Sequence, residues 1–554
     1  MIMNNQPNVM TKQIILRKSI CAALLGYCTV QCIDAKSDQF PSVIDAFDLY
    51  GGNGFSLLGA NNFDQSGYSV SNAGDLNGDG FKDVLIAAPF ADNDISGDRV
   101  GRTYVVYGDN QLFDRFVDLE SINESKGFAI EGDNPFIISG MSLSTAGDFN
   151  GDGFDDILIG APEASPLGRL FAGSTYLIFG SPTPPASILL LGNLKSSLGL
   201  RIDGAEPLDR SGTSISDAGD VNGDGFDDII IGSPNADPGG KQRAGSSYVI
   251  YGRKSNNNSS VDLSLIDPAD GFRIDGGYAY DSSGYSVSGN VDINGDGFYD
   301  LIIGAPSASP NSMTRAGSCY IVFGNGSFYF TNIDLSSINT TTGARFDGIT
   351  MFDATGKSVS GLQDFNSDGY DDVMFGAPFA DASLVNAGST YVIFGKPSFS
   401  FDNFPLVDLD ITIGFKLNGI SENSQSGFSV SDAGDINADG FTDLITGAPF
   451  NAPGIQQGLS FVYFGTNLHL PPEMSLLDVD GLNGFRFSNG SADPGRSVSG
   501  AGDFNGDNID DIVIGSPSFS VSDGVHSMPS IGISHIIYGK NVDLIFSNGY
   551  EDAF

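Results

Sequence analysis

The chain has 554 residues, of which 68 are Asp or Glu and only 26 are Lys or Arg, so its formal net charge is −42. Such acidity disfavours nucleic acid and anionic lipid surfaces as partners. No run of 18 or more apolar residues follows the repeats described below, so no membrane-spanning helix is expected there.

The first 35 residues differ from the rest of the chain. Lys12, Arg17 and Lys18 precede an apolar stretch over 20–30, which is too short to span a bilayer and is typical of a secretory signal peptide cut near Ala35. We therefore expect a secreted, extracellular or cell-surface protein, with the periplasm as an alternative. Three of the four cysteines lie in this leader, so no internal disulfide is expected in the mature protein.

The dominant feature of the chain is the pattern Asp-x-Asn-x-Asp-Gly-x-x-Asp, which occurs seven times. Successive copies begin 73, 72, 72, 72, 71 and 68 residues apart. This period suits one four-stranded sheet per unit, and seven such units make a closed ring. The seven loops span 75–83, 148–156, 220–228, 292–300, 364–372, 435–443 and 503–511.

Each loop places oxygen-bearing side chains at positions 1, 3, 5 and 9, with a glycine at position 6 that lets the backbone double back. A carbonyl at position 7 would complete a shell suited to calcium. Magnesium fits this donor set less well, and zinc would require His or Cys. Solvated turns use the same residue types, but seven copies with the same residues at the same loop positions favour metal-binding loops over solvated turns. In the last loop Asn508 replaces the glycine and is expected to adopt the same left-handed backbone.

The sequence thus predicts up to seven calcium ions. The predicted ligands are Asp75, Asn77, Asp79, Phe81 and Asp83; Asp148, Asn150, Asp152, Phe154 and Asp156; Asp220, Asn222, Asp224, Phe226 and Asp228; Asp292, Asn294, Asp296, Phe298 and Asp300; Asp364, Asn366, Asp368, Tyr370 and Asp372; Asp435, Asn437, Asp439, Phe441 and Asp443; Asp503, Asn505, Asp507, Ile509 and Asp511.

The segments around each loop have the patterns of strands. Residues 66–71 alternate small polar and larger side chains before the first loop, and 229–231 form an apolar β-branched run after the third. A third strand is predicted over 172–180. A fourth is predicted at Val117-Asp118-Leu119 and its relatives, which precede phrases such as 271–276. These elements predict an all-β, seven-bladed β-propeller with four antiparallel strands per blade and a calcium-binding hairpin loop in each.

The triplets Gly160-Ala161-Pro162 and Gly304-Ala305-Pro306, each behind an acidic loop, resemble the FG-GAP repeat of integrin alpha chains and related extracellular proteins. The resemblance covers about residues 45–545, and the propeller domain is assigned to 36–554. It implies an adhesion or recognition module, with the family's calcium ligands at the loop residues given above. An enzyme is not expected, because the residues offer no convincing catalytic set. The phenylalanine of the repeat's name is replaced, for example by Ser66 and Ser211.

Two similar phrases compete to close the ring. Phe47-Asp48-Leu49 near the start and Val542-Asp543-Leu544 near the end both resemble the predicted fourth strand. The resemblance to integrin heads favours the N-terminal copy, inserted beside the last blade. The C-terminal copy would then form an extra edge strand or a short arm.

Catalytic residues are not evident. His535 stands where other repeats have Thr or Ser, which predicts a strand residue, and His526 with Asp523 and Ser527 makes only a weak triad. Paired aspartates such as Asp155-Asp156 are interpreted as one metal ligand and one solvated neighbour.

A ligand, either an extracellular protein or a glycan, is expected on the face opposite the acidic loops. That face should carry the variable connections 90–101, 163–172, 235–243, 307–315 and 518–532. Large side chains at the same place in five successive repeats are interpreted as structural: Phe63, Phe136, Leu208, Tyr280 and Phe352. Candidates for contact are Leu170, Phe171, Tyr278 and Met351. An assembly scaffold and an unrecognised hydrolase are the alternatives.

Overall fold

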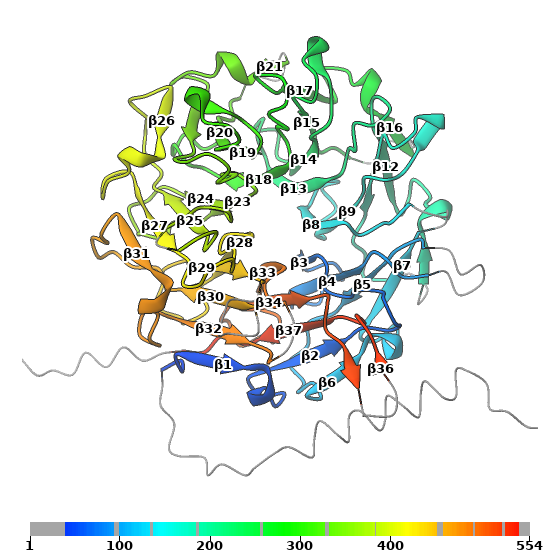
Figure 1. The fold of residues 1–554 in the computed structure, drawn as a ribbon. Helices are drawn as coiled ribbons and strands as arrows, with labels where there is room; N and C mark the ends of the chain where they lie inside the picture. Colours follow the sequence, from blue (N-terminus) through cyan, green and yellow to red (C-terminus); the bar gives the residue numbers. More distant parts are fainter. Residues whose placement is uncertain are drawn as a thin grey trace, which may run out of the picture.

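The computed structural model describes residues 39–541 except 93–98, 133–136, 184–187, 255–258, 327–331, 383, 451–457, 491–492 and 523–526. In this part of the chain, seven five-stranded sheets surround a common axis (Figure 1). Helical structure among the described residues consists of three-residue 3-10 turns. The fold is therefore a seven-bladed β-propeller, as predicted. The signal-peptide prediction for residues 1–35 lies outside the described residues.

The third blade illustrates the arrangement. Strands β13 (Ser214–Gly219), β14 (Asp228–Ser233), β15 (Ser246–Ile250) and β17 (Gly271–Asp275) pair antiparallel from the axis outward. The short β21 (Ile333–Asp334) from the next repeat then adds in parallel at the outer edge.

The other blades follow the same order, from the innermost strand outward. Blade 1 contains β3 (Val70–Gly74), β4 (Asp83–Ala88), β5 (Arg102–Val106), β7 (Gly127–Glu131) and β11 (Ile188–Leu190), and blade 2 contains β8 (Ser142–Gly147), β9 (Asp156–Ala161), β10 (Ser174–Ile178), β12 (Gly199–Asp203) and β16 (Ser260–Asp262). Blade 4 contains β18 (Ser286–Val291), β19 (Asp300–Ala305), β20 (Ser318–Val322), β22 (Gly343–Asp347) and β26 (Asn403–Pro405), and blade 5 contains β23 (Ser358–Leu362), β24 (Asp372–Ala377), β25 (Ser389–Ile393), β27 (Gly414–Asn418) and β31 (Glu473–Ser475).

Blades 6 and 7 combine the two ends of the chain. Blade 6 contains β28 (Ser429–Gly434), β29 (Asp443–Ala448), β30 (Leu459–Tyr463), β32 (Gly484–Ser488) and β1 (Val43–Asp45), and blade 7 contains β33 (Ser497–Gly502), β34 (Asp511–Ser516), β37 (Ile533–Ile537), β2 (Gly54–Leu58) and β6 (Phe116–Asp118). A separate hairpin pairs β35 (Val521–Ser522) with β36 (Ser527–Met528).

The 3-10 turns fall into two groups. One group follows the fifth strands: η1 (Ala46–Asp48), η2 (Leu119–Ser121), η4 (Leu191–Asn193), η6 (Leu263–Leu265), η8 (Leu335–Ser337), η9 (Leu406–Asp408) and η10 (Leu476–Asp478). The other lies between the second and third strands of blades 2, 3 and 4: η3 (Pro166–Gly168), η5 (Pro238–Gly240) and η7 (Pro310–Ser312).

The assignment of the fourth strand to Val117-Asp118-Leu119 was wrong. Residues Phe116–Asp118 form β6, a parallel fifth strand on the neighbouring blade, and the Gly-Phe-x-Ile-Asp phrase forms the fourth. The chain turns after β6 because the Asp118 carboxylate accepts the Glu120 N–H at 3.0 Å and starts η2, in which Leu119 is buried. This phrase therefore joins two blades instead of completing one.

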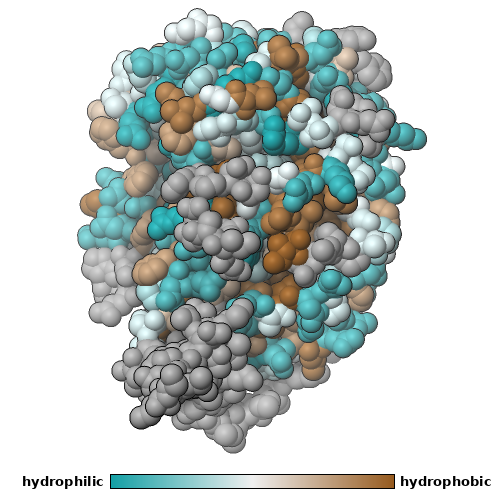
Figure 2. Space-filling view, turned by 90° about the vertical axis from the view of Figure 1, so that its right-hand side faces the viewer, coloured by the Kyte–Doolittle hydropathy of each residue, from teal (hydrophilic) through white to brown (hydrophobic). Residues whose placement is uncertain are grey.

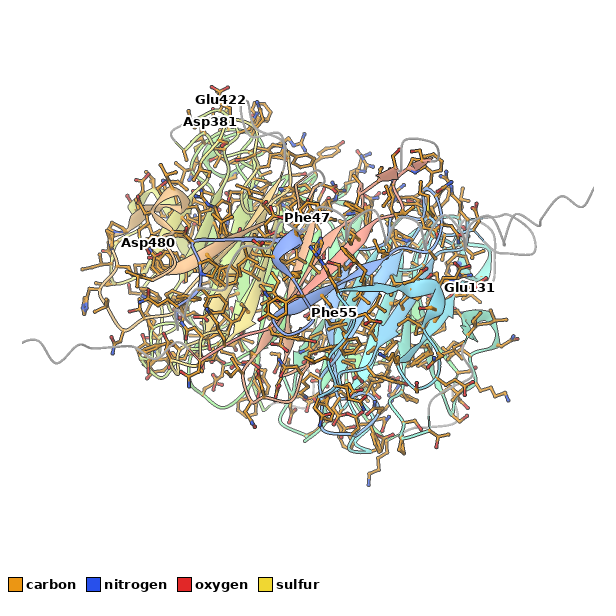
Figure 3. The ribbon with its side chains drawn as sticks, turned by 90° about the horizontal axis from the view of Figure 1, so that it is seen from below. Phe47, Phe55, Glu131, Asp381, Glu422 and Asp480 are labelled. Carbon is orange, nitrogen blue, oxygen red and sulfur yellow. The ribbon has the colours of Figure 1, made fainter. Side chains whose placement is uncertain are left out.

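An N-terminal strand closes the ring, as predicted, but it is not Phe47-Asp48-Leu49. Strand β2 pairs antiparallel with β37 in the last blade, while β1 pairs in parallel with β32 (Figure 1). Figure 3 shows Phe55 of β2 within the layers of strands and Phe47 on the turn that follows β1. The competing phrase Val542-Asp543-Leu544 lies outside the described residues.

The core lies between blades, because the second strands are buried on both faces. Ile229 and Ile231 of β14 pack with Leu158 of β9 and Leu177 of β10, on the preceding blade. Continuous apolar runs suit such doubly covered strands. Cys319 of β20 is fully buried. On the side of the ring shown in Figure 2, polar side chains dominate the surface and apolar ones form a narrow band.

Candidate calcium loops and ligand face

The seven acidic loops join the first and second strands of their blades. Gly219 pairs with Asp228 at the start of the third loop's hairpin, and the corresponding pairs flank the other loops. All seven loops therefore lie at the same end of their blades. The prediction that each loop is a hairpin tip is confirmed.

Within the first loop, the predicted ligands are turned inward onto backbone N–H groups. The Asp75 carboxylate accepts the N–H groups of Gly78 at 2.7 Å, Asp79 at 3.1 Å and Gly80 at 2.9 Å. Asn77 Oδ1 accepts the Asp79 N–H at 2.8 Å, and Asp79 Oδ1 accepts the N–H of Phe81 at 3.0 Å. These contacts hold the side chains of positions 1, 3 and 5 against the backbone of the turn.

The carboxylate at position 9 is fully buried. Asp83 Oδ2 accepts the N–H of Leu76 at 3.1 Å, and Oδ1 accepts that of Gly108 at 2.9 Å. Burial, together with the charges of Asp79 and Asp75, raises the pKa of Asp83 to about 8. Position 9 thus anchors the hairpin to its blade while adding a third carboxyl beside the loop.

The donor set of the loop fits a hard cation. All the side chains at positions 1, 3, 5 and 9 offer oxygen, and their crowded carboxylates repel one another unless a cation offsets the charge. In the described residues, no three His, Cys, Asp or Glu side chains already stand in a metal-binding arrangement. Asn508 has a φ of 66°, so the last loop adopts the left-handed backbone that the sequence predicted.

Neighbouring loops are joined by side chains at positions 7 and 8. Asp155 Oδ2, at position 8 of the second loop, accepts the Asp75 N–H of the first at 2.6 Å and pairs with Lys82 at 3.1 Å. The ring of Phe154, at position 7, covers Gly78, where a Cβ would lie 2.3 Å from the phenylalanine Cε1. The interpretation of Asp155 as a solvated neighbour of Asp156 was therefore wrong.

The same contacts recur around the ring. The position-8 carboxylates of Asp227, Asp371 and Asp510 accept the position-1 N–H groups of Asp148, Asp292 and Asp435 at 2.8, 2.8 and 2.9 Å. Phe81 of the first loop covers Gly506 of the last and so completes the circle. The acidic face is thus an interlocked ring of hairpin tips.

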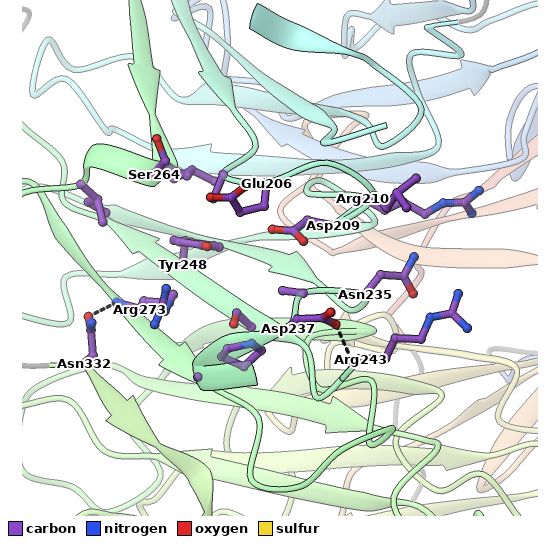
Figure 4. Close-up of a pocket in the computed structure, with 18 of the residues that line it drawn as sticks. Glu206, Asp209, Arg210, Asn235, Asp237, Arg243, Tyr248, Ser264, Arg273 and Asn332 are labelled. Carbon is purple, nitrogen blue, oxygen red and sulfur yellow. Dashed lines mark hydrogen bonds between the residues drawn. The ribbon is translucent and has the colours of Figure 1, made fainter. Parts of the chain in front are cut away.

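The opposite face carries the connections between second and third strands. Residues 235–243 lie there beside the connection 205–210 and enclose a cavity of about 1380 Å³ between blades 2 and 3 (Figure 4). A similar position one blade on holds a smaller cavity of about 550 Å³. Figure 3 shows Asp381, between the second and third strands of blade 5, and Glu422, in the connection from blade 5 to blade 6, together at one face of the ring.

The structure corrects the interpretation of the repeated side chains. Phe63, Leu208, Tyr280 and Phe352 are all more than half exposed, and their φ angles lie between 66° and 73°. What recurs is the left-handed turn, which places these bulky side chains in solvent. Phe136 lies outside the described residues. Of the proposed contact residues, Leu170, Tyr278 and Met351 are exposed and Phe171 is half-buried.

Cations and aromatic rings alternate near the axis on this face, from blade 4 to blade 1. The Lys357 Nζ lies 4.0 Å from the Tyr285 ring centroid, and the Arg496 guanidinium lies 4.7 Å from that of Phe428 and 5.3 Å from that of Tyr68. These residues lie just before the innermost strands of successive blades, so the contacts tie those blades together at the end opposite the acidic loops.

The FG-GAP repeat profile matches seven segments of the chain: 66–106, 139–178, 212–250, 283–322, 355–393, 428–463 and 494–526. The chain is an FG-GAP repeat protein. The first six matches span the three inner strands of a blade, such as β13 to β15 for 212–250. The fourth strand of each blade lies outside the matched segments. This is the strand that was assigned wrongly from the sequence.

The relatives of this FG-GAP protein include both enzymes and integrins. It is 27% identical to phosphatidylinositol-glycan-specific phospholipase D of Dictyostelium discoideum over 79% of this chain and 45% of that one. The corresponding rat protein is 32% identical over 43% of this chain and 26% of its own length. Integrin alpha pat-2 of Caenorhabditis elegans is 30% identical over 44% and 18%. The chain thus spans less than half the length of these relatives.

The candidate triad of this FG-GAP protein does not assemble from described residues. His526 and Asp523 lie outside them. His535 lies on β37 with 1% of its surface exposed, and its Nδ1 is 2.9 Å from Ser56 Oγ, which confirms a strand residue. The residues that sequence reasoning missed are those at position 8. Asp recurs there in four of the seven loops, and this recurrence was the available signal.

Proposed function

We propose that this FG-GAP propeller is an exported, calcium-binding recognition module that binds an extracellular protein or glycan through the face opposite its acidic loops. Its similarity to integrin alpha chains supports a role at or outside the cell surface. None of the described helices has the length and apolar character needed to cross a membrane. The basic and apolar residues before Ala35 support export.

The calcium part of the proposal rests on the donor chemistry of the loops. Positions 1, 3, 5 and 9 would supply side-chain oxygens, and position 7 a carbonyl, in each of the seven loops. A bound divalent ion would offset the repulsion among carboxylates such as Asp75, Asp79 and Asp83. Sites in extracellular modules commonly have Kd values of about 10⁻⁴ to 10⁻³ M, so calcium would remain bound outside cells. Its role here would be structural.

The recognition part rests on one observation, the contrast between the two faces. The acidic face repeats the same contacts from loop to loop, such as Asp155 to Asp75. The opposite face presents exposed side chains peculiar to single blades, including Leu170, Tyr278 and Met351. Aromatic and methionine side chains are enriched in contact surfaces. The varied face is therefore the one suited to choosing a partner.

The test uses the calcium-loaded full chain as a probe on a panel of extracellular proteins and glycans. The combined variant Leu170→Ser, Tyr278→Ser, Met351→Ser should lose binding to the ligand found. Leu112→Ser, which changes an exposed leucine outside the connections of that face, should retain it. Equal binding by all three proteins would refute recognition through this face.

We propose a binding role without catalysis, although some relatives are named as phospholipases. Asp155 supports this proposal, because its carboxylate already accepts the Asp75 N–H and pairs with Lys82. Hydrolysis of phosphatidylinositol-glycan anchors by the purified chain would overturn it. A scaffold role would instead show as a stable stoichiometric complex on purification from the native source.

A further inference from the structure

The cavity between blades 2 and 3 is large enough for an oligosaccharide. Its volume of about 1380 Å³ exceeds the 300–1,000 Å³ typical of small-ligand pockets. The equivalent junction between blades 3 and 4 encloses only about 550 Å³. These two neighbouring junctions therefore differ in cavity volume, although the backbone around them repeats.

The side chains that line this cavity carry equal numbers of formal positive and negative charges, although the whole chain has a net charge of −42. Three carboxyl groups and three guanidinium groups line it: Glu206, Asp209, Asp237, Arg210, Arg243 and Arg273. Two of the guanidinium groups already have acidic partners, since Arg273 pairs with Asp275 and Arg210 with Glu163. Among these guanidinium groups Arg243 alone lacks an acidic partner in the described part of the chain, so the lining disfavours a strongly anionic ligand.

Several polar groups in the lining remain available to a ligand. The side chains of Glu206, Asn235 and Arg243 make no hydrogen bond or ion pair with the described residues, and Glu206 and Arg243 are exposed (Figure 4). One is an acceptor, one a donor, and the amide is both. This mixture matches sugar hydroxyls, which donate and accept at neighbouring positions.

An exposed aromatic ring borders the same cavity. Tyr280 is 56% exposed and has a φ of 69°, a conformation that is strained for a bulky residue. Its N–H donates to the Gln242 carbonyl at 2.8 Å, and its hydroxyl hydrogen-bonds with the Gln242 side chain. These two contacts hold the ring in place while leaving more than half of the residue open. A fixed, accessible ring can stack on the C–H face of a sugar.

We propose that this cavity binds a neutral oligosaccharide, with Tyr280 stacking on one sugar and Glu206, Asn235 and Arg243 hydrogen-bonding its hydroxyls. The inference rests on the proposed function and names the ligand class for the face opposite the acidic loops. The smaller neighbouring cavity, which Tyr280 also borders, offers less room for further sugar units.

The test is an array of neutral and acidic oligosaccharides probed with the calcium-loaded full chain, followed by calorimetric titration of the best ligand. A neutral oligosaccharide should bind, and Tyr280→Asn should weaken it at least about tenfold. Asparagine suits this backbone, since Asn423 occupies the equivalent position with φ of 58°. The matched control Phe352→Asn removes an equally exposed ring that borders neither cavity, so its affinity should stay within about twofold.

Three results would overturn the inference: binding of acidic oligosaccharides only, an equal loss in both variants, or no neutral ligand on the array. An unchanged melting temperature in Tyr280→Asn establishes that any loss of binding is local. If the chain captures a protein through this face but no glycan, the saccharide inference fails and the recognition function stands. If neither ligand class binds, both fail.

Discussion

Ser56 Oγ and His535 Nδ1 lie 2.9 Å apart inside the last blade, although 479 residues separate them in the chain. Ser56 belongs to β2 and His535 to β37, so the contact joins the first and last repeats where the ring closes. His535 is fully buried and its ring lies 5.0 Å from that of Phe487. The equivalent position in other blades holds smaller residues, such as Thr175 and Ser247.

This contact predicts sensitivity to acid. Burial lowers the pKa of His535 from 6.5 to about 3, so the unfolded chain binds a proton that the folded chain excludes. The contribution of His535 to the free energy of unfolding is intact above pH 6.5. It is lost as the pH falls from 6.5 toward 3, by roughly 1.4 kcal/mol per pH unit. His535→Thr should therefore lose less stability than the wild type between pH 6.5 and 4.5, measured by denaturant unfolding. Parallel pH profiles for the two proteins would contradict it.

Ring closure predicts a second effect, on stability at neutral pH. Phe55 of β2 is fully buried and stacks on Phe113 at 4.3 Å, whereas Phe47 on the adjacent turn is half exposed (Figure 3). Phe55→Ala should lower the free energy of unfolding by about 3–5 kcal/mol. Phe47→Ala should cost less than about 1 kcal/mol. Similar losses in the two variants would show that β2 does not close the ring as described.

The interlocked loops predict energetic coupling between neighbouring blades. A Cβ on Gly151 would lie 2.4 Å from Cε1 of Phe226, which belongs to the next loop. Gly151→Ala should therefore destabilise the protein by about 1–3 kcal/mol, through this clash and a φ of 69°. In a Phe226→Ala background the clash disappears and only the backbone cost remains, so a double-mutant cycle should give a coupling of at least about 0.5 kcal/mol. Additive losses would exclude the contact.

Much of the fold follows from the sequence because its strongest signals are local. The loop pattern fixes a hairpin tip, the apolar run 229–231 fixes a doubly buried strand, and the even spacing fixes seven blades. Asn508 was expected to take a left-handed backbone because its short side chain tolerates that conformation, and it does.

The errors arose where the structure depends on distant parts of the chain. Nothing local distinguishes a fourth strand from the fifth strand β6, whose partner β2 lies about sixty residues earlier. Asp155 was taken for a solvated residue because its partner, the Asp75 N–H, belongs to the preceding blade. The exposed Tyr280 was interpreted as structural because recurrence in sequence reports a shared backbone turn, which does not determine side-chain burial.

The most direct test of the central claim is a calcium count by equilibrium dialysis against about 20 mM calcium, about twenty times the upper end of the Kd range of extracellular sites. The purified wild-type chain should bind about seven ions, one for each acidic loop. Asp220→Ala should bind one fewer, and Asp114→Ala, which changes an exposed aspartate outside the loops, should match the wild type. A folded chain that binds no calcium would contradict the claim.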